Sequence, residues 1–331
     1  MGKRIAFMGA GALGGYVGAY LTRHGQDLAL IDMWPGNGGT IRTRGLELDG
    51  VTPEEKFNVK AKALHLTEAQ ALAKEKPIDI AFISVKSYDT EWATHFIKPY
   101  LAPDGYCVSL QNCFNDEKIA GIVGWGKTLG IVSSIISVDM HGVARIRRTA
   151  AKGGDKHTVF RIGEVHGTIT KRVEELIAMF KVIDSVKGTT NLWGERWSKL
   201  TQNGMRNGVC AVTGLTSAQC DQNPAVRRFS ITLGGEGVRV GQALGYALEK
   251  MHGVEPAKLV AASMGSADTM TEIEEHLGSH AKENPRGNMQ FPSMAQDIRK
   301  APRTEIEFMN GLTVEKGRAL GIPTPSHEKL V

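Results

Sequence analysis

The sequence feature that most constrains the fold is a glycine-rich turn near the start of the chain. The stretch "GAGALGG" has the spacing G-x-G-x-x-G at Gly9, Gly11 and Gly14, and it directly follows the apolar run "RIAFMG". The next segment, "ALGGYVGAYLTRHG" (12–25), has the periodicity of an amphipathic helix, and "DLALID" (27–32) is a second apolar run. A glycine turn between a strand and a helix, followed by another strand, indicates a dinucleotide-binding unit.

Each position of this turn has a physical reason. The first glycine allows the sharp reversal, the second lets the backbone approach a pyrophosphate, and the third lets the helix pack against the strand. The free N–H groups at the start of the helix then point at the phosphates. The residues of the turn that we predict to bind the cofactor are Gly9, Ala10, Gly11, Ala12, Leu13 and Gly14.

The residue that ends the second apolar run bears on which dinucleotide is bound. Asp32 lies about twenty residues beyond the turn, where such folds place an acidic residue. A carboxylate accepts hydrogen bonds from a ribose 2′-hydroxyl and repels a 2′-phosphate, which favours NAD(H) over NADP(H). Arg42 and Arg44 lie shortly downstream and could bind a 2′-phosphate instead, or could be exposed loop cations.

Further apolar runs continue the pattern of the first half. They are "IDIAFISVK" (78–86), "YCVSLQN" (106–112), "TLGIVSSIISVDM" (128–140), "HTVFRIGEV" (157–165) and "VIDSVKGTT" (182–190), with the helical stretch "TEWATHFIKPYL" between the first two. Continuous apolar strands separated by helices indicate a parallel sheet that is covered on both faces.

The pattern changes at about residue 192, where long segments with helical periodicity and glycine or proline breaks begin. Strands followed by helices indicate two domains. We therefore predict an α/β fold with an N-terminal Rossmann-type, doubly wound sheet that binds a dinucleotide (1–190). The C-terminal domain is predicted to be all-α and to carry the substrate-binding and catalytic residues (191–331).

The composition narrows the class of protein. The chain has 331 residues, of which 41% are hydrophobic and 23% charged, as in soluble globular proteins. A net charge of +5 is too small and dispersed for nucleic-acid binding, and the cluster of Arg145, Arg147 and Arg148 is predicted to be a solvated loop.

The cysteines, histidines and apolar runs exclude further classes. The four cysteines form no CxxC pair and the ten histidines no HExxH, so we expect reduced thiols and no metal site. No apolar run approaches the ~18 residues of a membrane helix. We expect a cytoplasmic protein that acts on a small molecule, for which a homodimer is a compatible assembly.

The stretch "SKLTQNGMRNGV" (198–209) can be interpreted in two ways. Its Asn-Gly pairs are typical of hairpin turns. By spacing, however, Lys199, Asn203 and Asn207 lie at i, i+4 and i+8, which would align them on one face of a helix. A desolvated lysine there could protonate the alkoxide that hydride transfer to a ketone produces, and the amides could orient substrate hydroxyls or a carboxylate. The alternative is a surface lysine with two turn asparagines.

A second dense stretch is "FPSMAQDIRKAPRTEIEFMNG". Ser293 and Gln296 have the spacing of a capping box, so Ser293 is predicted to start a helix, where a substrate carboxylate would also find free N–H groups. Pro302 predicts a break or kink between residues 300 and 303. Glu305 could then point into a cleft or be solvated.

These stretches together resemble the ketopantoate reductase family (2-dehydropantoate 2-reductase) along nearly the whole chain. The matching pieces are "GAGALGG", "ISVKSYDT", "SLQN", "WSKLTQNGMRNGVCAVTG" and "PSMAQDIRKAPRTEIEFMNG", and the last two are fairly specific. The resemblance implies a Rossmann domain followed by a helical domain, with the active site in the cleft between them. It also implies reduction of the 2-oxo group of 2-dehydropantoate to (R)-pantoate, usually with NADPH.

The resemblance also implies roles for individual residues. Lys199 would lie on a helix facing the cleft and act as the general acid that protonates the forming alkoxide. Glu305 would bind near the substrate hydroxyl and the cofactor. Lys86 and Asn112 would line the nicotinamide side of the cleft. For the substrate, the resemblance implies that Asn203 and Asn207 contact hydroxyl and carbonyl groups and that Ser293 holds the carboxylate. Asn112 is also expected to contact the substrate.

Two departures from the family pattern keep alternatives open. Met33 follows Asp32 where the family commonly has an arginine for the 2′-phosphate, and Cys113 follows Asn112 where it commonly has glycine. An NAD-dependent D-2-hydroxyacid dehydrogenase of the same family is therefore one alternative. A non-catalytic dinucleotide-binding sensor is another, although a sensor need not keep a proton donor such as Lys199.

Overall fold

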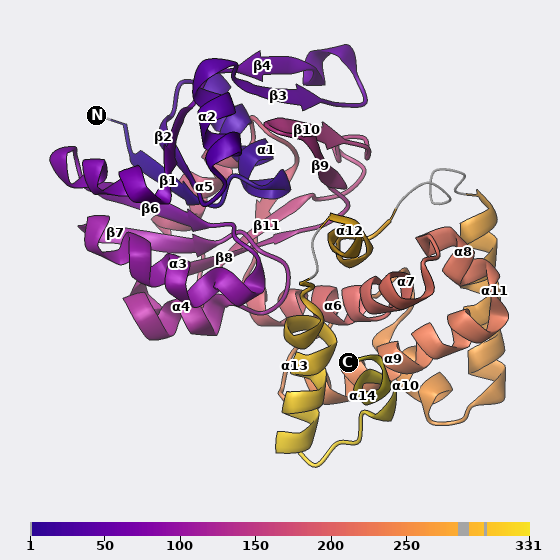
Figure 1. Ribbon diagram of the computed structural model, residues 1–331. Coiled ribbons are helices and arrows are strands. Elements are labelled where there is room, and N and C mark those ends of the chain that lie inside the picture. Colours follow the sequence, from indigo (N-terminus) through magenta and orange to yellow (C-terminus); the bar gives the residue numbers. More distant parts are fainter. Residues whose placement is uncertain (1, 284–290, 301–302) are drawn as a thin grey trace. The chain divides into compact units, whose positions relative to one another are not determined.

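The computed structural model describes residues 2–283, 291–300 and 303–331, and the chain divides into two compact units, Met1–Leu192 and Trp193–Val331 (Figure 1). The first unit contains two β-sheets with their covering helices. The second unit is helical. This arrangement confirms the predicted fold class.

The central sheet of the first unit has eight strands in the order β12-β11-β8-β7-β6-β1-β2-β5. The six neighbouring strands β8, β7, β6, β1, β2 and β5 are parallel to one another, whereas β11 is antiparallel to β8. The chain runs outward from β1 through β2 to β5 and then returns to β6, beside β1. The point between β1 and β6 is thus the switch point at which doubly wound folds bind ligands. The strands are β1 (Arg4–Met8), β2 (Asp27–Asp32), β5 (Lys62–His65), β6 (Ile78–Ile83), β7 (Leu101–Ser109), β8 (Thr128–Ser133), β11 (Phe160–Glu164) and β12 (Val186–Gly188).

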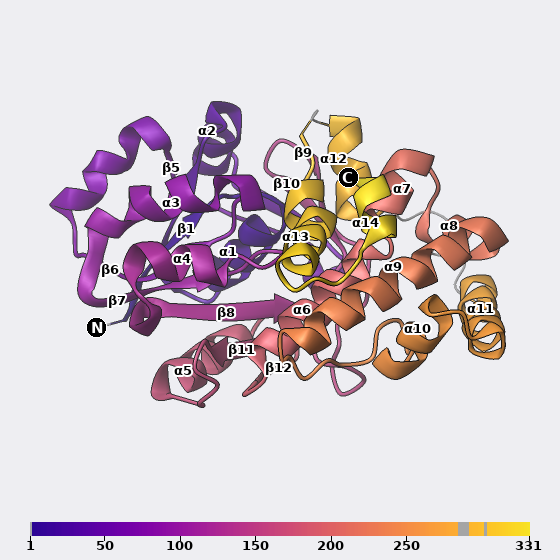
Figure 2. The ribbon, with the colours of Figure 1, turned by 90° about the horizontal axis from the view of Figure 1, so that it is seen from below.

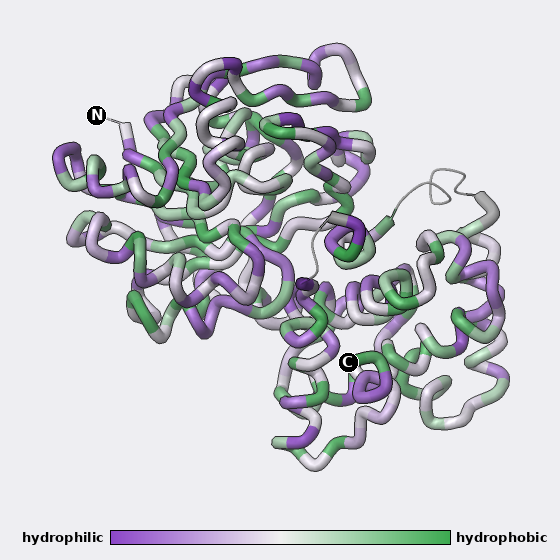
Figure 3. Tube along the Cα trace, in the orientation of Figure 1, coloured by the Kyte–Doolittle hydropathy of each residue, from purple (hydrophilic) through white to green (hydrophobic). Residues whose placement is uncertain are grey.

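Both faces of this sheet are buried, which explains the continuous apolar strands. Ile5 and Phe7 of β1 pack in the cluster that includes α1 and α5, whereas Ala6 and Met8 pack with α3 and α4. Figure 1 shows α3 and α4 side by side, and Figure 2 shows α5 beside β11 and β12. The central strands are largely hydrophobic along their length (Figure 3). The helices are α1 (Ala12–Arg23), α2 (Pro35–Thr43), α3 (Thr90–Ile97), α4 (Asp116–Val123) and α5 (Lys171–Phe180), with short 3₁₀ helices η1 (Pro53–Glu55), η2 (Leu66–Lys74), η3 (Ser87–Asp89), η4 (Lys98–Tyr100) and η5 (Trp125–Lys127).

A second sheet, with strand order β4-β3-β10-β9, was not predicted from the sequence. The prediction of one strand over 128–140 is wrong, because β8 ends at Ser133 and β9 begins at Val138 in the other sheet. Between them Ile135 and Ser137 have φ values of 54° and 44°, so the extended backbone is interrupted. The strands are β3 (Leu46–Asp49), β4 (Phe57–Val59), β9 (Val138–Gly142) and β10 (Arg145–Arg148).

The basic cluster is part of β10, so the prediction of a solvated loop is wrong. The side chains of Arg145 and Arg147 are exposed and form ion pairs with Glu47 and Asp139. Arg148 is buried and lies 2.6 Å from Asp184 Oδ2, because alternate residues of a strand point to opposite faces. Each arginine of the cluster is thus paired with an acidic residue of the first unit.

The second unit consists of nine described helices, which confirms the predicted all-α domain. Asn223 caps α9 by accepting hydrogen bonds from the N–H groups of Ala225 and Val226. Trp197 of α6 donates from Nε1 to the Gly237 carbonyl of α9 at 2.9 Å. Among the described residues, no helix is both long and apolar enough to cross a membrane. The helices are α6 (Leu192–Gly204), α7 (Asn207–Thr213), α8 (Ser217–Gln222), α9 (Pro224–Ala243), α10 (Pro256–Ser263), α11 (Ala267–Glu283), α12 (Ser293–Lys300), α13 (Ile306–Ala319) and α14 (Pro325–Leu330).

Candidate active site

The three glycines of the turn meet three different requirements. Gly9 has φ +102°, a backbone conformation that favours glycine. A Cβ on Gly14 would lie 2.3 Å from the Gly9 carbonyl oxygen and 2.4 Å from Ser84 Oγ, so only glycine allows α1 to pack this closely on the sheet. A Cβ on Gly11 would meet nothing within 4 Å. The open space beside Gly11 is compatible with the approach of a pyrophosphate.

The start of α1 has the features of an anion site. Gly11 is the N-cap residue, and it provides no side-chain cap for the N–H groups of the first turn. The first turn of this fully described helix contains no acidic residue, so nothing there opposes a negative charge. The turn and the helix start fit the phosphates of a dinucleotide.

Asp32 ends β2 and is only 6% exposed. Its Oδ2 atom accepts hydrogen bonds from the backbone N–H of Ala10 at 2.9 Å and from Asn37 Nδ2 at 3.2 Å. Its Oδ1 atom accepts from the N–H of Trp34 at 2.9 Å. The carboxylate thus stabilises the glycine turn, and Oδ1 retains a lone pair that a ribose hydroxyl could use.

The arginines that could bind a 2′-phosphate lie in the last turn of α2 and directly after it. Arg42 lies in the last turn of α2, and its Nη1 atom contacts both carboxylate oxygens of Glu68 at 2.7 and 2.8 Å. Arg44 is the exposed C-cap residue of the same helix. The sequence analysis missed His65, which fixes the turn after Asp32 through a contact of 3.0 Å between its Nε2 and the Met33 carbonyl oxygen.

Lys86 and Asn112 follow β6 and β7, so they lie at the same edge of the sheet as the glycine turn, which follows β1. Both residues are half-buried. The Asn112 carbonyl accepts a hydrogen bond from Asn115 Nδ2 at 2.9 Å. The next residue, Cys113, is buried and has φ +65°, a left-handed conformation that explains why glycine suits this position.

In the second unit, Lys199 and Asn203 lie on α6, but that helix ends at Gly204. Asn207 starts α7, so the prediction of one helix carrying all three polar residues is wrong for Asn207. The prediction of hairpin turns is wrong as well, because both Asn-Gly pairs belong to helices. A Cβ on Gly208 would lie 2.8 Å from Leu330 Cδ2, so a larger residue here would displace the end of the Leu330 side chain.

Asn207 and Ser293 contact each other although they lie far apart in the sequence. Ser293 Oγ donates to Asn207 Oδ1 at 3.1 Å, and the N–H of Met294 donates to the same oxygen at 3.3 Å. Ser293 starts α12, as predicted. The contacts of Gln296 differ from those of the predicted capping box, because its N–H donates to the Pro292 carbonyl at 3.1 Å and its side-chain amide donates to the Phe291 carbonyl at 2.8 Å.

Glu305 is the N-cap residue of α13 and is 3% exposed, so it is not a solvated side chain. Lys199 is half-buried. Pro302 lies outside the described residues. The break that it predicts between residues 300 and 303 falls on the same undescribed residues and stays a prediction.

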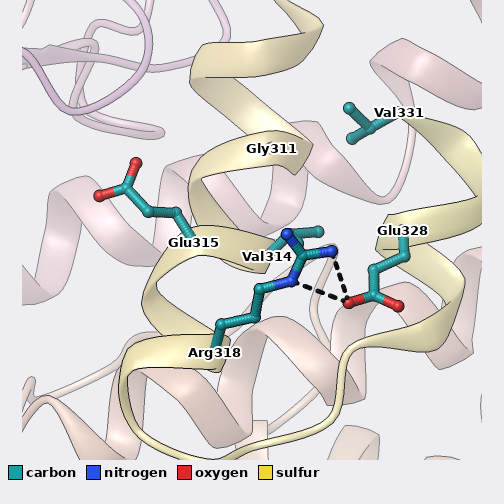
Figure 4. A pocket seen from close by; sticks show the side chains of 6 residues that line it. All are labelled: Gly311, Val314, Glu315, Arg318, Glu328 and Val331. Atoms are coloured by element: carbon teal, nitrogen blue, oxygen red, sulfur yellow. Dashed lines mark hydrogen bonds and ion pairs between the residues drawn. The ribbon is translucent and has the colours of Figure 1, made fainter.

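Two surface pockets contain none of the predicted site residues. The first, of about 440 Å³, lies between α13 and α14, where Arg318 and Glu328 form an ion pair at 3.2 Å (Figure 4). The second, of about 530 Å³, is lined by residues that include Lys152 and Lys181. Within the described parts of the chain, no group of three or more His, Cys, Asp or Glu residues could hold a metal ion.

Comparisons with known proteins match both units to one family. Residues 5–157 match the family described as "Ketopantoate reductase PanE/ApbA", and residues 191–331 match "Ketopantoate reductase PanE/ApbA C terminal". A protein of Aquifex aeolicus named 2-dehydropantoate 2-reductase is 28% identical over 99% of this chain and 94% of its own length.

Solved structures show the same architecture. The PanE/ApbA family ketopantoate reductase from Ralstonia eutropha JMP134 has a TM-score of 0.78 and 27% identity, and the match covers 99% of this chain and 95% of that one. The ternary structure of D-mandelate dehydrogenase with NADH and anilino(oxo)acetate has a TM-score of 0.79 at 19% identity, with 99% and 95% coverage, and it shows likeness of fold alone.

Proposed function

The chain belongs to the ketopantoate reductase family, and we propose on this basis that it uses a nicotinamide dinucleotide to reduce 2-dehydropantoate, or a similar branched 2-oxo acid, to the (R)-2-hydroxy acid. The observation that carries the proposal is the match of both units to one family, in a chain that keeps Lys199, Asn203, Ser293 and Glu305. A dinucleotide site alone would serve many reactions, whereas a lysine among amides and a hydroxyl suits the reduction of a 2-oxo acid.

The first unit binds the cofactor through the turn at Gly9, Gly11 and Gly14, and Lys86 and Asn112 line the nicotinamide side. A bound dihydronicotinamide supplies the hydride to C2 of the substrate. As the new C–H bond forms, the π electrons of the carbonyl move to the oxygen, which becomes an alkoxide.

The second unit supplies the proton and orients the substrate. The Lys199 ammonium gives a proton from Nζ to the forming alkoxide, and the neutral amine later recovers a proton from solvent. Asn203 and Asn207 contact the hydroxyl and carbonyl groups of the substrate, and Ser293 binds its carboxylate. Glu305 binds near the substrate hydroxyl and the cofactor.

We propose that NADH is preferred over NADPH. The Asp32 carboxylate would repel a 2′-phosphate, and its Oδ1 atom can accept from a 2′-hydroxyl. Arg42 is already engaged with Glu68, at the opposite end of α2 from Asp32. A preference of tenfold in kcat/KM corresponds to about 1.4 kcal/mol.

Asp32 also favours a second candidate, an NAD-dependent D-2-hydroxyacid dehydrogenase of the same family. The test measures the oxidation of NADH and of NADPH with 2-dehydropantoate and with a panel of 2-oxo acids, and determines the configuration of each product. Turnover of 2-dehydropantoate well above that of the other acids supports the first candidate, and turnover of aryl or unbranched acids alone supports the second. A tenfold preference for NADPH would contradict the assignment of Asp32.

Two further expectations stay predictions. The homodimer is checked by light scattering of the purified protein, and the cytoplasmic location by fractionation of cells that produce it.

A further inference from the structure

Two buried side chains outside the candidate site contact the end of the helix that carries Lys199. In an uninterrupted α-helix the carbonyl of Gly204 would accept from the N–H four residues later. Here Asn310 Nδ2, from α13, donates to that carbonyl at 3.0 Å. A Cβ on Gly204 would lie 3.5 Å from both Asn310 Nδ2 and His327 Cε1, so both side chains pack against this residue.

His327 determines how the Asn310 amide is oriented. Nε2 of His327 lies 2.9 Å from the Leu233 carbonyl oxygen, which can only accept, so Nε2 carries the hydrogen. In the neutral ring Nδ1 is then an acceptor, and it lies 3.2 Å from Asn310 Nδ2. The same NH₂ group thus faces two acceptors, Gly204 O and His327 Nδ1. Rotating the amide by half a turn would place an oxygen against both of them.

We propose that Asn310 and His327 are positioning residues that fix the carboxyl end of α6. Asn310 bonds to the Gly204 carbonyl and His327 orients the Asn310 amide. Together they stabilise the end of α6 at Gly204, and so set the register between Asn203 at its end and Asn207 at the start of α7. The inference rests on the proposed function, in which these two amides and Lys199 act on the substrate.

The contacts at the junction agree with this role. Across the break, the N–H of Arg206 donates to the Asn203 carbonyl at 3.0 Å, and Asn207 Nδ2 contacts the same oxygen at 3.3 Å. Arg206 also forms an ion pair of 2.6 Å with Asp221 of α8. A displacement of Gly204 would therefore move both amides.

The contact depends on the protonation state of His327. If Nδ1 carries a proton, it faces the NH₂ group of Asn310, and the hydrogen bond between these two groups is lost. If the amide then turns so that its oxygen accepts from Nδ1, the same oxygen faces the Gly204 carbonyl, and the hydrogen bond to Gly204 is lost instead. Burial lowers the pKa of His327, while the Leu233 carbonyl and Glu236 raise it. Glu236 faces His327 from α9 and accepts from the N–H groups of Ser326 and His327, and Asn310, facing it from α13, is uncharged.

Two substitutions separate the two ring nitrogens. His327→Asn keeps an acceptor near the Nδ1 position and loses the donor to Leu233. His327→Gln keeps a donor near the Nε2 position and loses the acceptor for Asn310. Both remove an imidazole from the same buried position, so both should lower Tm. We expect kcat for 2-dehydropantoate within about threefold of the unsubstituted protein for His327→Asn, and ~10–100-fold lower for His327→Gln.

Three further readouts distinguish positioning from general loss of stability. NADH affinity should be unchanged in both variants, because the residues proposed to hold its phosphates and ribose lie in the first unit. The ratio of kcat of the unsubstituted protein to kcat of His327→Asn should fall as the pH is lowered. Only the unsubstituted protein has an imidazole that takes up a proton and thereby loses a hydrogen bond at Asn310. The matched control is Ile273→Ala, a cavity in the core of the same helical unit, which should lower Tm without lowering kcat. Equal kcat losses in the two His327 variants, or a pH-independent ratio, would overturn the proposal.

Hydrogen exchange keeps this test separate from the proposed function. If the unsubstituted protein reduced no 2-oxo acid, the proposed function would fail, but the amides of residues 205–208 would still report on the end of α6. They should exchange faster in His327→Gln than in His327→Asn. The same exchange rates in both variants would show that the pair does not set the end of the helix.

Discussion

Replacing Asp32 by asparagine should affect both the stability of the first unit and its choice of cofactor. The carboxylate accepts hydrogen bonds from Ala10, Trp34 and Asn37. An asparagine can direct its oxygen to only one side. If the oxygen faces Ala10 and Asn37, the NH₂ group faces the N–H of Trp34, and the partly buried hydrogen bond from that N–H is lost. The loss of this bond costs about 1–3 kcal/mol.

This cost can be expressed as measurable shifts. In a unit of this size, about 1–3 kcal/mol corresponds to a loss of ~2–12 °C in Tm. The loss of a charge-assisted hydrogen bond to the ribose 2′-hydroxyl, worth about 1.5–3 kcal/mol, should weaken NADH binding by about 10- to 150-fold. NADPH binding should weaken less, because the charge that repels its 2′-phosphate is removed. The ratio of the two dissociation constants therefore isolates the effect on the ribose from any general damage.

The matched control is Asp27→Asn, the same substitution at the exposed start of the same strand. Calorimetry gives Tm, and quenching of protein fluorescence gives the two dissociation constants. Asp27→Asn should change neither quantity. The reasoning is refuted if Asp32→Asn leaves both Tm and the NADH to NADPH ratio as they are, because the carboxylate would then neither stabilise the turn nor contact the ribose.

Three other substitutions or conditions test separate parts of the argument. Lys199→Ala should lower kcat by ~10²–10⁴-fold in steady-state assays, with the NADH dissociation constant unchanged, because only the proposed proton donor is removed. Cys113→Gly should be more stable than Cys113→Ala by about 1 kcal/mol in urea denaturation, because alanine retains the strain of φ +65°. Because its folded-state pKa lies below the ordinary value of 6.5, His327 contributes stability that is present above pH 6.5 and is lost as the pH falls below it. In urea melts His327→Asn should therefore remove part of the acid slope, up to about 1.4 kcal/mol per pH unit.

The elements that the sequence predicted best are those determined by local pattern. Within a few residues, the turn has a positive φ at Gly9, open space at Gly11 and a close packing contact at Gly14. Each of these requirements is met by glycine, so the sequence shows the pattern directly. The strands of the central sheet are buried on both faces, so they appear as apolar runs. Both features can be recognised within a short stretch of sequence.

The second sheet and the end of α6 could not be predicted in this way. The strands β3 and β10 pair across a large sequence separation, with Glu47 and Arg145 98 residues apart, and the strands are short. The donor to the Gly204 carbonyl is Asn310, 106 residues later in the chain. The Asn203-Gly204 pair marks the break in the sequence, but the residue that occupies the carbonyl is distant, so spacing alone extended the helix to Asn207.

The contact between Ser293 and Asn207 bears on the proposal that Ser293 binds the substrate carboxylate. The Ser293 hydroxyl has one hydrogen, and it is donated to Asn207 Oδ1 at 3.1 Å. In that state Ser293 presents only lone pairs, which repel a carboxylate. To bind the substrate the hydroxyl must turn away from Asn207, while the N–H of Met294 continues to bond to the same oxygen. Asn207 thus keeps the start of α12 in place whether or not the substrate is bound. The contribution of Ser293 to binding is then the free energy of its hydrogen bond to the carboxylate minus that of the hydrogen bond to Asn207 that it gives up.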